Sequence, residues 1–303
     1  LTSCAPRSQV TVSGKLKVVT TLFPLYDFVR EIAGDKVEVS LLLPPGVESH
    51  AYEPSPRDII DILKAAVFIY TGKFMEPWAD KIIQASQGKS LLIVDASQGI
   101  ELMAEHDDHE EHDGEPEGDD HSHDHGGQDP HIWLDPIYAL KMVDNIVSGL
   151  AQADPKNADL YKSNGELYKH KLRALDSKFV EMFAQSQSKK IIYAGHFAFG
   201  YFAKRYGLEH VSPYRGFAPD AEPTPQRIAE LIKTVNESNT RVIYYEELVD
   251  PKVAKVIADQ TGAKMLLLHG AHNVSKEDLS GGITYLEIME DNLQKLLEGL
   301  SGK

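Results

Sequence analysis

The sequence predicts an α/β protein of two lobes, each with a mostly parallel sheet flanked by helices, joined by one long rigid helix. Three observations lead to this prediction. Short apolar runs rich in β-branched residues alternate with amphipathic stretches, a pattern typical of parallel sheets. A stretch without strand signals, residues 136–186, interrupts the pattern, which restarts beyond it. The length of 303 residues is enough for two domains of ordinary size.

The first half of the chain supplies the elements of an N-terminal lobe, residues 15–145. The segment "KLKVVTTLFPLYDFVREIAG" combines an apolar strand run with an amphipathic helix that ends at Gly34. A second strand is expected in "VEVSLLLPPG", and two short buried strands in "AVFIYTG" and "SLLIVDAS". Helices are expected from Ser55, a favourable N-cap followed by proline, and near residues 76–87.

The connecting helix is assigned to residues 146–187 and the C-terminal lobe to residues 188–303. Apolar residues recur at spacings of three to five in "NADLYKSNGELYKHKLRALDSKFVEMFAQS", which indicates a helix of roughly thirty residues. Such a helix rises about 45 Å, enough to run along two domains. The C-terminal lobe has candidate strands in "KKIIYAG", "HVSPYRG", "RVIYYEE" and "KMLLLHG", with helices near residues 197–207, 225–237, 250–262 and 284–300.

The net charge of −15 is concentrated in one segment. Residues 101–129 contain thirteen Asp or Glu, six His and no Lys or Arg, so the rest of the chain is close to neutral. The chain has no basic face, which excludes nucleic acid as a partner. Because residues 104–129 have too little apolar surface to offset the entropy of ordering, we expect a disordered insertion there. Its histidines are expected to form several weak, exchanging metal sites, the alternative being a charged solubilising loop: His106, His109, His112, His121, His123 and His125.

The only cysteine, Cys4, lies in "LTSC" and is followed by a polar stretch to Gly14. This tetrapeptide resembles the end of a bacterial lipoprotein signal, in which the cysteine is lipidated. We therefore expect residues 1–14 to be a flexible lipoprotein N-terminus, with a free thiol as the alternative. No run of about 18 apolar residues is present, so contact with the membrane is expected only through the lipid.

Four histidines outside the acidic segment lie near the ends of candidate strands or in short loops: His50, His131, His196 and His272. In a parallel sheet, the loops at the carboxyl ends of the strands gather at one edge, where ligands usually bind. Two of these histidines come from each half of the chain, so two lobes that meet at that edge would bring all four together. Four imidazoles suit tetrahedral Zn²⁺.

Four segments carry a family resemblance: "PPGVESHAYEPSPRDI", "DPHIWLDP", "YAGHFAFGYFAKRYGL" and "GGITYLEIMEDNLQKL". They resemble the signature segments of the zinc/manganese substrate-binding proteins of bacterial ABC transporters, the ZnuA-type group, and the resemblance extends over the chain from about residue 15. It implies two α/β lobes, a rigid connecting helix and a metal ion buried between the lobes. It also implies an extracytoplasmic, membrane-anchored or periplasmic protein that is no enzyme, works as a monomer and presents Zn²⁺ to a permease and ATPase complex.

The resemblance places the first three metal ligands on His50, His131 and His196. Zinc members resemble this sequence in having His at the third position, where many manganese members have Glu. The fourth position is His272, where members commonly have Asp or Glu, and this exchange favours Zn²⁺ over Mn²⁺. His269 or a water molecule is the alternative fourth ligand, and Glu246 is expected either to orient a ligand histidine or to bind the metal itself.

Other functions are weighed against this one. A manganese or mixed-metal binding protein of the same fold is the main alternative. A metallohydrolase is disfavoured, because "HSHDH" and "HEEH" are too short for the known hydrolase patterns and four protein ligands leave no position for water. A binding protein for siderophores or corrinoids could use Tyr214 and Arg215, but it would not explain the four histidines. A role as an adhesin is not tested by the sequence.

Overall fold

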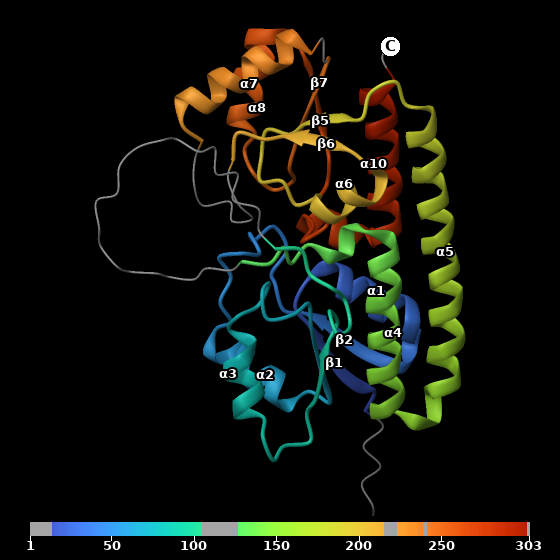
Figure 1. The fold of residues 1–303 in the computed structure, drawn as a ribbon. Helices are drawn as coiled ribbons and strands as arrows, with labels where there is room; N and C mark the ends of the chain where they lie inside the picture. Colours follow the sequence, from blue (N-terminus) through green and yellow to red (C-terminus); the bar gives the residue numbers. More distant parts are fainter. Residues whose placement is uncertain (1–13, 105–126, 215–222, 239–240, 302–303) are drawn as a thin grey trace, which may run out of the picture.

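The structure, a computed structural model, describes residues 14–104, 127–214, 223–238 and 241–301. Two lobes lie one above the other in Figure 1, and the long helix α5, Ala158–Gln185, runs along both of them. Each lobe contains parallel strands with helices packed against them. The predicted class of two α/β lobes joined by one long helix is confirmed.

The N-terminal lobe is built on a four-stranded, fully parallel sheet with the order β2-β1-β3-β4. The strands are β1 Leu16–Thr20, β2 Val37–Leu41, β3 Val67–Tyr70 and β4 Leu92–Asp95. The helices of this lobe are α1 Phe23–Ala33, α2 Pro56–Lys64 and α3 Ala79–Ala85, and a short 3-10 turn, η1 Gly34–Lys36, precedes β2.

Alternation of side chains along the strands explains why helices cover both faces of this sheet. Val67 and Ile69 of β3 are buried in one apolar cluster with α1 and the later helix α4. Phe68 and Tyr70 of the same strand are buried in a second cluster with α2 and α3. Because the sheet is enclosed on both faces, its ligand-accessible positions are the loops at the carboxyl ends of the strands.

The C-terminal lobe has two pairs of parallel strands, joined by one bridge between Tyr193 and Tyr244. The pairs are β5 Lys190–Ile192 with β6 Glu209–Val211, and β7 Val242–Tyr245 with β8 Lys264–Leu267. The helices are α6 Gly200–Tyr206, α7 Pro225–Glu237, α8 Lys252–Thr261, α9 Lys276–Gly281 and α10 Tyr285–Leu300. The short helix α9 was not predicted from the sequence.

The strand-free region contains two helices rather than one. α4, Pro136–Ala153, and α5 are separated by the 3-10 turn η3, Pro155–Asn157. Pro155 has no backbone N–H and disfavours helical geometry at the residue before it, so the first helix ends there and the chain reverses. The predicted connecting helix, residues 146–187, is therefore too long at its start, since it includes the last turns of α4. The predicted boundaries of the two lobes, residues 15–145 and 188–303, stay predictions.

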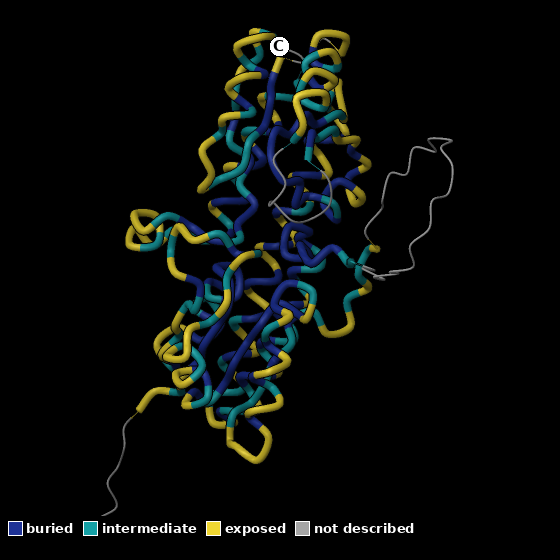
Figure 2. The backbone as a smooth tube through the Cα atoms, turned by 90° about the vertical axis from the view of Figure 1, so that its left-hand side faces the viewer, coloured by how far each residue is buried: buried dark blue, intermediate teal, exposed yellow. Residues whose placement is uncertain are grey.

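The lobes share one apolar core. A single cluster of buried side chains includes Phe28 of α1, Met142 of α4, Phe179 of α5, Phe202 of α6 and Leu296 of α10. Figure 2 shows buried backbone continuing through the junction between the two lobes. Both lobes therefore pack against α5 through this shared core and are not joined only by a flexible linker.

The predicted insertion, residues 104–129, is too wide at both ends. Ala104 and Gln128 form an antiparallel bridge, and Asp129 is completely buried. The six histidines of the insertion, and Cys4, lie outside the described residues. Among the residues that the structure describes, no helix is both long enough and apolar enough to cross a membrane.

Candidate metal site

The fold brings His50, His131, His196 and His272 into one cluster. One ligand atom from each lies within 4.8 Å of those of the other three. The Nε2 atoms of His50 and His131 are 3.2 Å apart, and the ring centroids of the four imidazoles are 4.9 to 6.1 Å apart. No other group of three or more potential ligands was found within the described ranges.

The four ligand positions come from loops at one end of each lobe. His50 lies in the loop after β2, His131 directly before the 3-10 turn η2, Ile132–Leu134, His196 after β5, and His272 after β8. These are loops at the carboxyl ends of parallel strands and the entry to α4, which face each other where the lobes meet. The sequence placed these histidines at such positions, and the packing of the lobes makes the positions converge.

Burial keeps two of the four imidazoles, those of His50 and His131, neutral. His131 is fully buried and His196 is 2% exposed. Burial, assisted by the neighbouring His272, lowers the pKa of His50 to about 4, and burial together with the surrounding histidines lowers the pKa of His131 well below its usual range. Metal binding requires unprotonated imidazoles, so these two ligands are ready to bind at neutral pH.

Asp129 supports His131 from behind. Its Oδ1 accepts hydrogen bonds from Nδ1 of His131 at 2.7 Å and from the His131 backbone N–H at 2.9 Å. Gly200 leaves room for this carboxylate, since a Cβ atom there would lie 2.5 Å from Oδ2 of Asp129. Asp129 was not predicted as a site residue because it was placed in the insertion, although a carboxylate two residues before a ligand histidine was a usable signal.

Glu247 lies behind His272 and was also missed. Its Oε1 is 3.3 Å from Nδ1 of His272 and 3.5 Å from Nδ1 of His269, and its Oε2 accepts the Gly270 N–H at 2.7 Å. Burial raises the pKa of Glu247, but the two histidines and this hydrogen bond outweigh burial and lower it to about 2. The carboxylate is therefore ionised at neutral pH.

His269 was predicted as an alternative fourth ligand, and Glu246 as an orienting residue or a metal ligand. Neither is a member of the cluster. Oε1 of Glu246 accepts the backbone N–H of His196 at 3.2 Å, and burial chiefly raises the pKa of Glu246 to about 7. Nδ1 of His269 accepts the backbone N–H of Ala271 at 2.9 Å. Arg215 lies outside the described residues, and the Tyr214 backbone N–H is bonded to Ser212.

The loop that carries His272 is fastened to the other lobe. The carbonyl of His272 accepts the N–H of Phe23 at 3.1 Å, and the carbonyl of Gly270 accepts the indole N–H of Trp133 at 2.8 Å. The side-chain amide of Asn273 donates to the carbonyl of Pro44 at 2.7 Å. His272 therefore belongs to the C-terminal lobe by sequence but is held against the N-terminal lobe, like His50 and His131.

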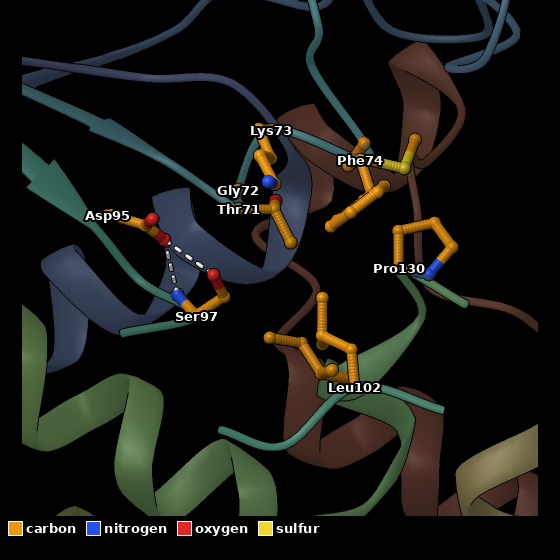
Figure 3. Close-up of a pocket in the computed structure, with 10 residues that line it drawn as sticks. Thr71, Gly72, Lys73, Phe74, Asp95, Ser97, Leu102 and Pro130 are labelled. Atoms are coloured by element: carbon orange, nitrogen blue, oxygen red, sulfur yellow. Dashed lines mark hydrogen bonds between the residues drawn. The ribbon is translucent and has the colours of Figure 1, made fainter. Parts of the chain in front are cut away.

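A separate cavity of about 110 Å³ lies at the ends of β3 and β4 (Figure 3). Asp95 is its lining carboxylate, and Oδ1 of Asp95 accepts hydrogen bonds from the backbone N–H and hydroxyl of Ser97 at 2.8 and 2.7 Å. Apolar side chains, among them Phe74 and Leu102, form much of the remaining wall. The cavity lacks the ligand set of a metal site, so the histidine cluster is the candidate functional site.

Comparisons with known proteins identify the family of the chain. The family described as zinc-uptake complex component A, periplasmic (ZnuA) matches residues 18–299. The high-affinity zinc uptake system protein ZnuA of Bacillus subtilis is 40% identical over 287 residues, which cover 94% of this chain and 88% of that protein. The zinc-binding protein AdcA of Streptococcus pyogenes is 37% identical over 294 residues, which cover 95% of this chain but 56% of that longer protein.

A solved structure has the same fold. The Zn(II)-bound ZnuA-like domain of AdcA from Streptococcus pneumoniae matches with a TM-score of 0.79 and 32% sequence identity, covering 95% of this chain and all of that domain (100%). The family match spans nearly the whole described chain, and the similarity to the Bacillus protein extends over most of both sequences. The chain belongs to the ZnuA family of periplasmic zinc-uptake components.

Proposed function

We propose that this protein is an extracytoplasmic zinc-binding protein that delivers Zn²⁺ to an ABC permease for uptake. The observation that carries the proposal is the cluster of four histidines, whose ligand atoms lie within 4.8 Å of one another. In this proposal His50, His131, His196 and His272 bind the ion. A shift of each ring by a fraction of that distance gives Zn–N bonds of about 2.0–2.1 Å.

Zinc is preferred to manganese because of the ligand atoms. Imidazole nitrogen suits Zn²⁺, whereas Mn²⁺ prefers carboxylate, carbonyl and water oxygens. No carboxylate belongs to the cluster among the described residues; the carboxylates of Asp129 and Glu247 contact ligand histidines instead. The names of the relatives support the same ion, since the Bacillus protein is named for zinc uptake and the AdcA domain was solved with Zn(II) bound.

The same geometry supports a role in binding without catalysis. A catalytic zinc site keeps one coordination position open for water or substrate, and four protein ligands close that position. The protein's task is then to capture the ion and present it to a permease and ATPase complex. It does so as a monomer anchored by lipid at Cys4, and the histidines of residues 104–129 bind further zinc weakly.

A competitive zinc titration tests the proposal. The intact chain, a chain lacking residues 105–126 and the variant His131→Ala are titrated against a chromophoric chelator, with Mn²⁺ as a competing ion. We expect one tight zinc site in the first two proteins, loss of that site in the variant, and no displacement by equimolar Mn²⁺. If the deletion abolishes the tight site, or if His131→Ala keeps it, the assignment of the cluster as the zinc site is wrong. If Mn²⁺ displaces zinc, the proposed preference for zinc is wrong.

Delivery is tested with the cognate permease and ATPase in proteoliposomes. Zinc-loaded protein is expected to stimulate ATP hydrolysis and ⁶⁵Zn uptake, and the His131→Ala variant is expected to do neither. Equal stimulation by both proteins would contradict a role for the cluster in transport.

A further inference from the structure

Glu247 is a buried charge with no place in the ligand set. It is the second residue after β7, its side chain is 8% exposed, and it is not a member of the histidine cluster. Oε1 faces two imidazoles, those of His269 and His272, while Oε2 is held by the Gly270 N–H. A buried carboxylate is costly unless it is paired, so these contacts define what Glu247 does.

The two neighbouring imidazoles play different parts. The backbone N–H of Ala271 donates to Nδ1 of His269 at 2.9 Å, so that nitrogen carries a lone pair and cannot donate to Glu247. Nδ1 of His272, 3.3 Å from Oε1, is therefore the imidazole nitrogen that donates its proton to the carboxylate. His272 is therefore in the tautomer that carries its proton on Nδ1.

The tautomer of His272 decides which of its nitrogens can bind the metal. With the proton on Nδ1, Nε2 of His272 carries the lone pair. Nε2 is buried and has no hydrogen-bond partner among the described residues. The ring centroid of His272 lies 5.1 Å from that of His131 and 5.7 Å from that of His50. A buried lone pair without a hydrogen-bond donor, next to the other histidines of the cluster, is suited to bind a cation.

Charge gives a second role to the same carboxylate. Four neutral imidazoles leave the full double positive charge of Zn²⁺ in a buried site, where an uncompensated charge is expensive. Glu247 places a negative charge behind the ring of His272, hydrogen-bonded to the Nδ1 that faces away from the ion, and gives the ion no oxygen ligand. The ion thus keeps an all-nitrogen ligand set, which favours zinc, and still has a nearby anion.

We propose that Glu247 is a positioning residue of the metal site, which fixes the tautomer and orientation of His272 and supplies negative charge behind the neutral imidazole ligands. This inference rests on the proposed zinc function. A carboxylate that orients a ligand histidine typically contributes a factor of about 10 to 100 in metal affinity.

A double-mutant cycle on the full chain tests the inference. Zinc affinity is measured by chelator competition for the wild type, Glu247→Gln, His272→Ala and the double variant. We expect Glu247→Gln to weaken binding about 10- to 100-fold, and to cause less than about a twofold further loss in the His272→Ala background, because its effect passes through His272. With Co²⁺ as a probe, the visible spectrum of Glu247→Gln is expected to shift towards that of His272→Ala.

Controls separate this role from a general loss of stability. Glu76→Gln replaces another buried glutamate, which is bonded to Thr21 and Thr71 and contacts no cluster histidine, and its zinc affinity is expected to stay within about twofold of the wild type. Glu247→Asp keeps the charge at a greater distance and is expected to bind with an affinity between those of wild type and Glu247→Gln, so it serves if the glutamine variant folds poorly. Unchanged affinity in Glu247→Gln, or equal losses in both backgrounds, would overturn the inference. A wild-type chain without a tight zinc site would instead overturn the proposed function.

Discussion

Asp129 holds His131 by two hydrogen bonds to one oxygen. Oδ1 accepts the backbone N–H at 2.9 Å and the imidazole Nδ1–H at 2.7 Å. Both residues are fully buried, so the pair cannot exchange its hydrogen bonds with water. The ring is thereby fixed with Nε2 directed at Nε2 of His50, 3.2 Å away. An Asp two residues before a His, a short local motif, thus orients His131 towards His50 in the loop after β2.

Asp129→Asn is expected to weaken zinc binding about 10- to 100-fold, because the amide removes the negative charge and weakens the hold on the Nδ1–H tautomer. Chelator competition measures the change. Asp154→Asn is the matched control, since Asp154 is buried but bonds to Tyr161 and Asn157, away from the cluster. An Asp129→Asn variant that binds zinc as tightly as the wild type would show that the ring needs no carboxylate to hold it.

Proton release on zinc binding is expected to be small. Four ordinary imidazoles, each with a pKa of about 6.5, would release about three protons per zinc at pH 6. Burial lowers the pKa of His50 to about 4 and that of His131 well below its usual range, so these two rings have no proton to release at that pH. We expect fewer than two protons per zinc at pH 6, measured by calorimetry in buffers of different ionisation enthalpy. Release of three would mean that both rings are protonated in the free protein.

The sequence was sufficient to predict elements whose cause is local. The cap at Ser55 was predicted, and its side chain accepts the N–H of Asp58. The four histidines could be placed together because parallel strands expose their carboxyl-end loops at one edge. The break between α4 and α5 at Pro155 also has a local cause. It was not predicted, because apolar residues recur at helical spacing on both sides of the proline.

The supporting carboxylates could not be predicted in the same way. Asp129 resembles its acidic neighbours in sequence, and only the packing of Gly200 and Tyr201 against it buries it; Tyr201 donates its hydroxyl to the Asp129 carbonyl at 2.7 Å. Glu246 and Glu247 are adjacent, and the direction of the chain after β7 decides which of them faces His272. Such assignments depend on tertiary contacts between segments far apart in the chain.

Asp27 of α1 gives a prediction for stability. Its Oδ2 accepts the N–H of Tyr285 at the start of α10, and burial chiefly raises its pKa to about 6. Since the folded pKa is above the unfolded value, the folded state binds more protons between about pH 4 and 6, and the contribution of Asp27 to stability falls as pH rises through that window. The ionised form costs about 3 kcal/mol at neutral pH.

Asp27→Asn keeps an acceptor for Tyr285 and removes this cost. We expect the variant to gain stability relative to the wild type as pH rises from 4 to 7, by at most about 3 kcal/mol. Urea unfolding of the metal-free proteins at both pH values measures the difference. A gap between variant and wild type that does not change with pH would show that Asp27 does not titrate in this window.

Gly270 is the backbone position on which the His272 ring packs. A Cβ atom there would lie 2.6 Å from Cε1 and 2.7 Å from Nδ1 of His272, and the ring would have to move. The two backbone hydrogen bonds of Gly270, to Glu247 and from Trp133, do not depend on a side chain and are expected to persist in Gly270→Ala. The variant should therefore fold with a urea midpoint close to that of the wild type and lose zinc affinity by about tenfold or more, because a ligand displaced by about 1 Å binds poorly. Gly281→Ala, where a Cβ atom meets nothing within 4 Å, is the control and should bind zinc normally. If Gly270→Ala also binds normally, the position of His272 is not critical, and the cluster holds zinc through its other three histidines.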